Sequence, residues 1–414
     1  MEAIVTLQFN GTDVTVGKLF TSIRRGIESA HFTYDTAYMR SSNAVSLCPE
    51  MPLSPGTFPA EHNAMHRIFQ DCMPDRWGRN LMLRAERQDA RSEHRTARTL
   101  FEGDLLLSVN DETRQGALRF WNNDGDALAP SETGVPREVT IPQLLTEADL
   151  AVQDMNADIR DLLAAGSSLG GARPKASIRN EKGALCIAKF PKADEDLVDD
   201  VCAWERTTLQ LAAQTGINVP NTRLLRVRGR SVLVLDRFDR RGAQRIPYLS
   251  GLTAVQGNDG EHYSYLELVE FLEEHGSSPE SDIQQLWRRA LFSCAIGNVD
   301  NHMRNHGFLY DFSGKGWALS PAFDINPTPG DNPKLLNSSI DFDDRSADVS
   351  LAMDCADYFR IADDEAKRIA GKMADVLSNW QRVALSNGIS PASIAMMSSC
   401  FESGIARLRE ASAQ

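Results

Sequence analysis

The sequence predicts an α+β protein with a small strand-rich lobe and a larger helical lobe, preceded by an N-terminal α/β subdomain. Turn-forming residues gather near 124–142, strand patterns follow, and helical periodicity dominates after Gly242. At 414 residues the chain is too long for one ordinary core. The predicted boundaries are 1–130 for the subdomain, 140–240 for the strand-rich lobe and 241–414 for the helical lobe.

The N-terminal part reads as a small sheet with helices. Apolar residues alternate between Ile4 and Phe9, and Asn10-Gly11-Thr12-Asp13 follows as a hairpin turn. Residues 62–88 are helical by composition, with an interruption at 74–78. A further strand is predicted over Gly116–Trp121.

The middle part begins with a helical run over 141–165 that ends at Gly166. A glycine-rich turn over 167–175 comes next, followed by strands over 176–179 and 184–190, a helix over 201–214 and a hairpin over 223–235. This order is that of a small ATP-binding lobe.

The last part is mostly helical. Ser278-Pro279 is a helix start, with Ser as N-cap and Pro at the first helical position, and Gly297 ends that helix. Two short strands follow near 308–310 and 317–319. One long helix is predicted over 363–386, and a final helix opens at Ser390-Pro391.

The composition excludes several classes of protein. A net charge of −13 argues against non-specific nucleic-acid binding. The seven cysteines form no C-x-x-C pair, which argues against a zinc site or a disulfide framework and favours a reducing compartment. The start of the chain does not resemble a signal peptide, and no stretch reaches eighteen apolar residues. We therefore expect a cytoplasmic protein without a membrane span.

The residues that carry chemistry lie in two predicted loops of the helical lobe. Asp300 and Asn305 are five residues apart, just after a buried helix, and Asp324 follows the second short strand. Phosphoryl transfer to a hydroxyl requires a carboxylate that orients the acceptor and takes its proton, together with oxygen ligands for Mg²⁺. The spacing predicts Asp300 as the base and Asn305 and Asp324 as Mg²⁺ ligands.

The strand-rich lobe supplies the groups that would hold a nucleotide. Lys189 stands on a strand after the glycine-rich turn, and Glu205 lies in the next helix. A strand lysine paired with a helix glutamate holds the α and β phosphates in kinases. Glu205 could instead face solvent. Lys175 could be a surface lysine, but it comes just after Gly170 and Gly171, where a phosphate contact is expected.

Two histidines leave an alternative open. His302 and His306 are four residues apart beside the aspartates, so a metallohydrolase could be built from them. No H-E-x-x-H motif is present, and a kinase loop fits Gly297 and Asn301 better. We expect the histidines to orient the loop or the acceptor, and we place His302 near the nucleotide.

Several motifs resemble those of the HipA family of toxin kinases. The stretch 297–308 is similar to the family's catalytic loop, 319–327 to its metal-binding segment and 168–177 to its glycine-rich loop. Residues 187–191 resemble its ATP lysine strand and 232–241 its hinge. In the first domain, 73–79 and 116–120 resemble its N-terminal motifs.

This resemblance implies a serine/threonine kinase fold that uses ATP and Mg²⁺. It places Asp236 and Phe238 at the adenine and makes Ser168 an autophosphorylation site, with Ser167 as the neighbouring hydroxyl. It also implies a HipB-like helix-turn-helix antitoxin, contact with DNA only through that antitoxin, and a protein substrate such as an aminoacyl-tRNA synthetase. The alternative is a catalytically silent module that acts as a co-repressor with the antitoxin.

Overall fold

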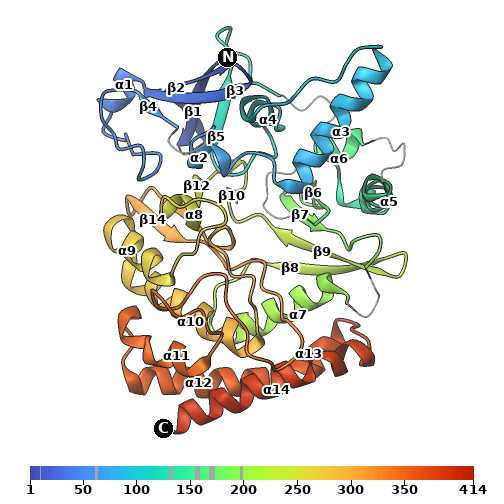
Figure 1. The fold of residues 1–414 in the computed structure, drawn as a ribbon, viewed down its shortest axis with the longest axis vertical. Helices are drawn as coiled ribbons and strands as arrows, with labels where there is room; N and C mark the ends of the chain where they lie inside the picture. The colour runs from blue at the N-terminus through green and yellow to red at the C-terminus, as the bar shows by residue number, and fades with distance from the viewer. Residues whose placement is uncertain (10, 61–63, 130–133, 154–158, 167–172, 196–198) are drawn as a thin grey trace. The chain divides into compact units, whose positions relative to one another are not determined.

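The computed structural model describes residues 1–414 except 10, 61–63, 130–133, 154–158, 167–172 and 196–198 (Figure 1). By their internal contacts the described residues form two units. The first comprises Met1–Ala193 with Asp236–Leu249, and the second comprises Asp194–Leu235 with Ser250–Gln414. Each unit is described by itself.

The first unit is built on a five-stranded antiparallel sheet with strand order β4-β3-β2-β1-β5. Its apolar face is covered by Phe69, whose ring packs edge-on against Phe32 at 5.7 Å and Phe120 at 5.8 Å. All three rings are fully buried. The strands are β1 Glu2–Phe9, β2 Thr12–Arg24, β3 Ile27–Tyr34, β4 Phe58–Pro59 and β5 Leu118–Trp121.

Helices and short strands complete this unit. The predicted helical region 62–88 is divided at the expected place, because α2 ends at Gln70 and α3 begins at Arg76 with Asp75 as its N-cap. The helices are α1 Thr36–Met39, α2 Arg67–Gln70, α3 Arg76–Ser92, α4 Glu102–Leu107, α5 Ile141–Val152 and α6 Arg160–Ala164, with the 3₁₀ turn η1 Glu138–Thr140. The strands are β6 Lys175–Arg179, β7 Leu185–Lys189, β10 Arg240–Arg241 and β11 Gln244–Arg245. Strand β12, Tyr248–Ser250, runs from this unit into the second.

The second unit is mainly helical. It also contains β8 Thr222–Val227 and nearly all of β9 Arg230–Asp236, which pair as an antiparallel hairpin. Helix α10 is its core: the predicted apolar stripe, which includes Ile283, Leu286 and Ala290, has no exposed surface. Helices α9 and α14 pack against α10, and α12 lies beside α14 (Figure 1). The remaining elements are α7 Val201–Gln214, α8 Gly251–Ala254, α9 Tyr265–His275, α10 Pro279–Ile296, η2 Met303–Asn305, β13 Gly307–Asp311, β14 Gly316–Leu319, α11 Val349–Asp354, η3 Ala356–Phe359, α12 Asp363–Leu377, α13 Trp380–Ser386 and α14 Pro391–Ala413.

The helix predicted over 363–386 is wrong in one respect, since it forms two helices, α12 and α13. Ser378 donates its hydroxyl to the Ala374 carbonyl and Asn379 donates its amide to the Asp375 carbonyl, and such side-chain bonds compete with the helical ladder. Trp380 nevertheless packs inward as predicted, stacked on Phe401 with ring centroids 4.5 Å apart.

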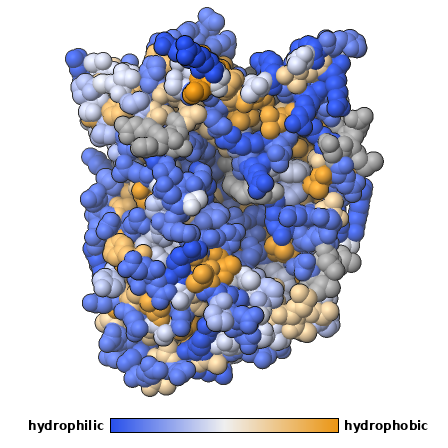
Figure 2. All heavy atoms as spheres, in the orientation of Figure 1, coloured by the Kyte–Doolittle hydropathy of each residue, from blue (hydrophilic) through white to orange (hydrophobic). Residues whose placement is uncertain are grey.

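The surface is largely hydrophilic on the face that Figure 2 shows, with hydrophobic residues in small groups. No helix among the described residues is long and apolar enough to cross a membrane. All seven cysteines are buried and unbridged.

Candidate functional site

The candidate loop begins where α10 ends. Gly297 adopts φ 62°, which lies in the left-handed region that glycine enters without strain. A Cβ atom at this position would lie 2.6 Å from Lys334 Nζ and 3.0 Å from Cys400 Sγ. The sharp turn at Gly297 therefore requires glycine for two reasons: the positive φ angle, and the lack of room for a Cβ atom.

The two ends of the D-x-x-x-x-N spacing meet in this loop. The Asn305 side-chain amide donates to the Asp300 backbone carbonyl at 2.6 Å. The Asp300 carboxylate accepts from Asn337 Nδ2 at 3.1 Å, and its side chain is 70% exposed. His302 Nε2 lies 3.8 Å from the same carboxylate. Asp300 is thus oriented by its neighbours while it stays open to an incoming group.

A distant segment, residues 337–339, fixes the loop from outside. Asn337 donates its backbone N–H to Val299, and Ser338 exchanges two hydrogen bonds with the buried Asn301 side chain, at 3.0 and 3.1 Å. Nothing in the sequence pattern linked this segment to the loop, which lies about forty residues earlier. Asn337 is a site residue that sequence reasoning missed.

Asp324 lies in the segment that follows β14. Its φ of 54° is in the left-handed region, which is uncommon for a residue other than glycine. Strained backbone of this kind persists where the surroundings hold it, and it concentrates at functional sites. Here the surroundings are the Ser320 N–H bonded to Gly307 and the Thr208 hydroxyl bonded to the Ile325 carbonyl.

Asn305 and Asp324 line one small cavity of about 20 Å³, together with Tyr265 and Arg289. Because Asn305 uses its Nδ2 to bond Asp300, its Oδ1 is the amide atom suited to a cation. One carboxylate with one amide oxygen is a donor set that fits Mg²⁺, which usually keeps waters and phosphate oxygens as its other ligands. The structure therefore brings the two predicted metal ligands together.

The histidines do not form a metal centre of their own. Burial lowers the pKa of His306 to about 3, so this ring is neutral, and it packs edge-on against Tyr265 at 4.9 Å. Among the described residues no group of three or more His, Cys, Asp and Glu side chains is arranged to hold a metal. A catalytic zinc site needs about three protein ligands, so the metallohydrolase alternative loses its support.

Glu205 lies on α7 and is only 3% exposed, so the solvent-facing alternative is wrong. Lys189 belongs to the first unit, where it ends β7 and pairs in register with Lys175 on β6. The ion pair between Lys189 and Glu205 stays a prediction.

Lys175 is buried and forms an ion pair with Asp75, with Nζ 2.9 Å from Oδ2. Burial raises the pKa of Asp75 although Lys175 opposes the rise. The predicted phosphate contact of Lys175 stays a prediction. Asp75, which also caps α3, is a partner that the sequence did not indicate.

The segment after β9 carries the residues expected at the adenine. Asp236 Oδ1 accepts from the buried Cys186 thiol at 3.3 Å, and the Phe238 ring lies 6.3 Å from that of Tyr248. The next residues are fixed by Asp239, which accepts from Arg237, Arg240 and the Gly116 backbone N–H. Although burial raises the pKa of Asp239, Arg237 and Arg240 outweigh it and hold that pKa well below its ordinary value.

Four predicted residues, Ser167, Ser168, Gly170 and Gly171, lie outside the described residues.

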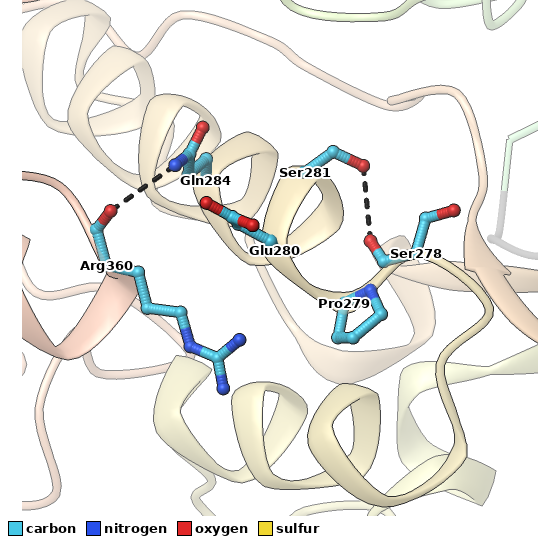
Figure 3. Close-up of a pocket in the computed structure, with 6 residues that line it drawn as sticks. All are labelled: Ser278, Pro279, Glu280, Ser281, Gln284 and Arg360. Atoms are coloured by element: carbon cyan, nitrogen blue, oxygen red, sulfur yellow. Dashed lines mark hydrogen bonds between the residues drawn. The ribbon is translucent and has the colours of Figure 1, made fainter.

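A second hollow, of about 560 Å³, lies at the start of α10 and is lined by Ser278, Gln284 and Arg360 (Figure 3). The figure shows the Gln284 amide reaching the Arg360 carbonyl, at 3.3 Å. This hollow contains none of the predicted site residues and stands at the opposite end of an 18-residue helix from the loop, about 27 Å away.

Two family models match the chain. "HipA-like C-terminal domain" matches residues 167–380, just over half of the chain, and "HipA N-terminal domain" matches residues 10–101. The chain belongs to the HipA family. The predicted family resemblance is therefore confirmed, and both family regions are present in the predicted order.

Two curated relatives match part of the chain. A Haemophilus influenzae protein named "Putative kinase" is 24% identical over 42% of this chain and 56% of its own length. "Putative kinase Y4mE" of Sinorhizobium fredii is 28% identical over 36% of each chain. The chain thus spans about half or less of the curated relatives it matches.

A solved structure shares the fold of the chain. HipA of Shewanella oneidensis, solved with HipB and operator DNA, superposes with a TM-score of 0.67 at 18% identity, over 99% of this chain and 97% of that one. The Helicobacter pylori proinflammatory kinase CtkA gives 0.39 at 16% identity over 57% of this chain and 93% of that one. The predicted α+β fold class is confirmed by the HipA match.

Proposed function

We propose that this HipA-family chain is an ATP- and Mg²⁺-dependent serine/threonine protein kinase. The observation that carries the proposal is that Asn305 links the Asp300 backbone to a cavity that Asp324 also lines. Transfer of a phosphoryl group to a hydroxyl requires a base and oxygen ligands for Mg²⁺ close to one another, and this link supports that arrangement.

In this proposal Asp300 orients the acceptor hydroxyl and takes its proton. Its exposure lets a protein side chain reach it, and Asn337 and His302 hold the carboxylate in place. Asn305 Oδ1 and Asp324 hold Mg²⁺, which when bound neutralises charge on the phosphate oxygens. Lys189, paired with Glu205, contacts the α and β phosphates, and Asp236 and Phe238 contact the adenine.

The biological role that we propose is that of a growth-inhibiting toxin. This rests on family membership, together with the HipB-containing complex of the Shewanella relative. The partner would be a HipB-like helix-turn-helix antitoxin, and the net charge of −13 agrees with DNA contact through that partner. The substrate would be a translation-related protein such as an aminoacyl-tRNA synthetase.

The deciding experiment is transfer of labelled phosphate from γ-labelled ATP to proteins of a cell lysate, with identification of the labelled band. We expect labelling by the wild type and none by Asp300→Asn. A chain that binds the antitoxin but labels nothing would instead be a catalytically silent module.

Autophosphorylation is a separate part of the proposal. Ser168, or its neighbour Ser167, would accept phosphate in the glycine-rich loop, where the added charge of about −1.5 to −2 repels ATP. Peptide mass spectrometry after incubation with ATP and Mg²⁺ should find phosphate on Ser168 in the wild type and not in Asp300→Asn. An unmodified wild-type peptide would reject this switch.

A further inference from the structure

The cavity that Asn305 and Asp324 line is also lined by buried polar atoms that lack partners among the described residues. Arg289, Asn298 and His306 are each 4% exposed. Among the described residues, Arg289 Nε and Nη1 and Asn298 Oδ1 make no hydrogen bond with protein atoms, and the His306 ring has only a weak one, with the Asn301 backbone. Buried polar atoms are almost always satisfied, so the unsatisfied atoms of Arg289 and Asn298 around one cavity point to something that bonds them.

Of these residues, Arg289 should reduce the stability of the fold most, because its buried side chain is charged. It stands on α10 next to the apolar stripe, and burial lowers its pKa to about 10, so the guanidinium remains charged at neutral pH. Among the described residues no carboxylate forms a salt bridge with it, and Nη2 donates to the Ser320 carbonyl. Asp282 interacts with this charge only at longer range. A buried charge without a salt-bridged anion destabilises a fold, which indicates that Arg289 is kept for function rather than stability.

The cavity has the size and the chemistry of a site for one water molecule. Its volume of about 20 Å³ exceeds the roughly 10–15 Å³ that one water needs. Arg289 offers two N–H donors, and Asn298 offers a carbonyl acceptor, as a water with two to four polar partners requires. The imidazole of His306 supplies a further partner.

We propose that one ordered water in this cavity links Arg289 to Asn298 and His306, and that Arg289 is thereby a positioning residue for the metal ligands. Asn298 and His306 flank the loop that contains Asp300 and Asn305. The guanidinium directly holds Ser320, four residues before Asp324. One charged group therefore fixes both Mg²⁺-ligand segments, one by a direct bond and one through water.

The central test compares Arg289→Met with Arg288→Met. Arg288 is the adjacent residue on α10, partly buried, with Glu365 3.8 Å away, and it does not line the cavity. For Arg289→Met we expect the Mg²⁺ concentration for half-maximal activity to rise about 10- to 100-fold, as for other outer-shell residues. Its Tm should stay within about 4 °C of the wild type. Arg288→Met should leave the Mg²⁺ requirement unchanged. An unchanged Mg²⁺ requirement in Arg289→Met, or a fall in Tm that accounts for the loss, would overturn the proposal.

The water itself is tested by coupling and by direct observation. Arg289 and His306 share no hydrogen bond among the described contacts, although they are close enough for the Arg289 charge to lower the pKa of His306. We expect the effects of Arg289→Met and His306→Phe on the Mg²⁺ requirement to be non-additive in the double variant. A crystal structure should show density for the water in the wild type and none in the double variant. Additive effects, or an empty wild-type cavity, would contradict the link.

Only the activity readout rests on the proposed function. If the wild type transfers no phosphate, the kinase proposal fails, and amide hydrogen exchange over residues 298–306 still decides the inference. Faster exchange in Arg289→Met than in Arg288→Met supports the link, whereas equal exchange rejects it.

Discussion

Asn305 donates a 2.6 Å hydrogen bond to the backbone carbonyl of Asp300, so a residue proposed to hold Mg²⁺ also sets the backbone of the proposed base. The bond uses the amide nitrogen of Asn305 and leaves the amide oxygen as the atom proposed to bind Mg²⁺. A substitution of Asn305 therefore affects both roles, whereas Asp300→Asn changes only the carboxylate and keeps the backbone carbonyl that Asn305 bonds.

Asp300→Asn should abolish phosphoryl transfer and leave ATP affinity within about twofold of the wild type, because the base does not hold the nucleotide. Transfer from γ-labelled ATP and calorimetry with Mg²⁺-ATP measure the two effects. The control is Asp357→Asn, an exposed carboxylate on η3. Near-wild-type transfer by Asp300→Asn would disprove the assignment.

We expect the Asp324 side chain to be needed for Mg²⁺-ATP binding and its backbone φ angle to favour glycine for stability. Both Asp324→Ala and Asp324→Gly should weaken Mg²⁺-ATP binding, because each removes the carboxylate. Since φ is 54°, the glycine variant should be more stable than the alanine variant, by about 1 kcal/mol. Urea denaturation ranks the stabilities. An alanine variant that equals glycine in stability would show that the backbone is not strained.

Lys189→Ala should lower both ATP affinity and transfer, because its ammonium neutralises phosphate charge in the ground and transition states. The control is Lys182→Ala, an exposed lysine in the preceding turn. Calorimetry with Mg²⁺-ATP is the measurement. Unchanged affinity in Lys189→Ala would remove the phosphate role.

Gly297→Ala should destabilise the protein by about 1–3 kcal/mol and reduce transfer, since it strains the backbone and meets Lys334 and Cys400. Gly260→Ala provides the comparison, because Gly260 also has positive φ, 88°, with nothing within 4 Å of its Cβ position. That variant should lose less stability and keep full transfer. Equal losses of stability in the two variants would mean that packing at Gly297 contributes nothing.

Asp239→Asn should cost about 3–5 kcal/mol near neutral pH, because it leaves Arg237 and Arg240 buried without their anion. The folded-state pKa of Asp239 is depressed, so its contribution is present above the unfolded value near 3.9 and is lost as pH falls through the folded value. The gap in stability between wild type and variant should therefore stay constant from pH 7 to about 4 and narrow below. Asp124→Asn, at an exposed position, should show no gap.

The sequence predicted what depends on local pattern. Helix α7 was predicted over the residues that form it, and Gly297 was predicted as the end of α10. What it could not predict are partners far apart in the chain, such as Asn337 for Asp300 and Asp75 for Lys175. Their pairing depends on how the elements pack, and no spacing encodes it.

Arg289 left one signal in the sequence, since a charge three residues after Leu286 and beside Ala290 interrupts the apolar face of a buried helix. A lone charge on such a face does not by itself indicate a site, because a long side chain can often reach solvent past its apolar neighbours. The role of Arg289 depends on the cavity and on the polar atoms around it, which only the folded chain brings together.

The Asp239 cluster makes the N-terminal residues part of the same cooperative structure as the segment expected at the adenine. Arg237 and Arg240 donate to the backbone carbonyls of Thr113, Arg114 and Gly116, and Gly116 donates to Asp239. A fragment cut at residue 140 would keep two buried cations and their anion while it lost these acceptors and the donor. Removing the N-terminal residues would therefore leave unsatisfied charge at the segment that we propose contacts the adenine. Inactivity of such a fragment would say nothing about the chemistry of the full chain.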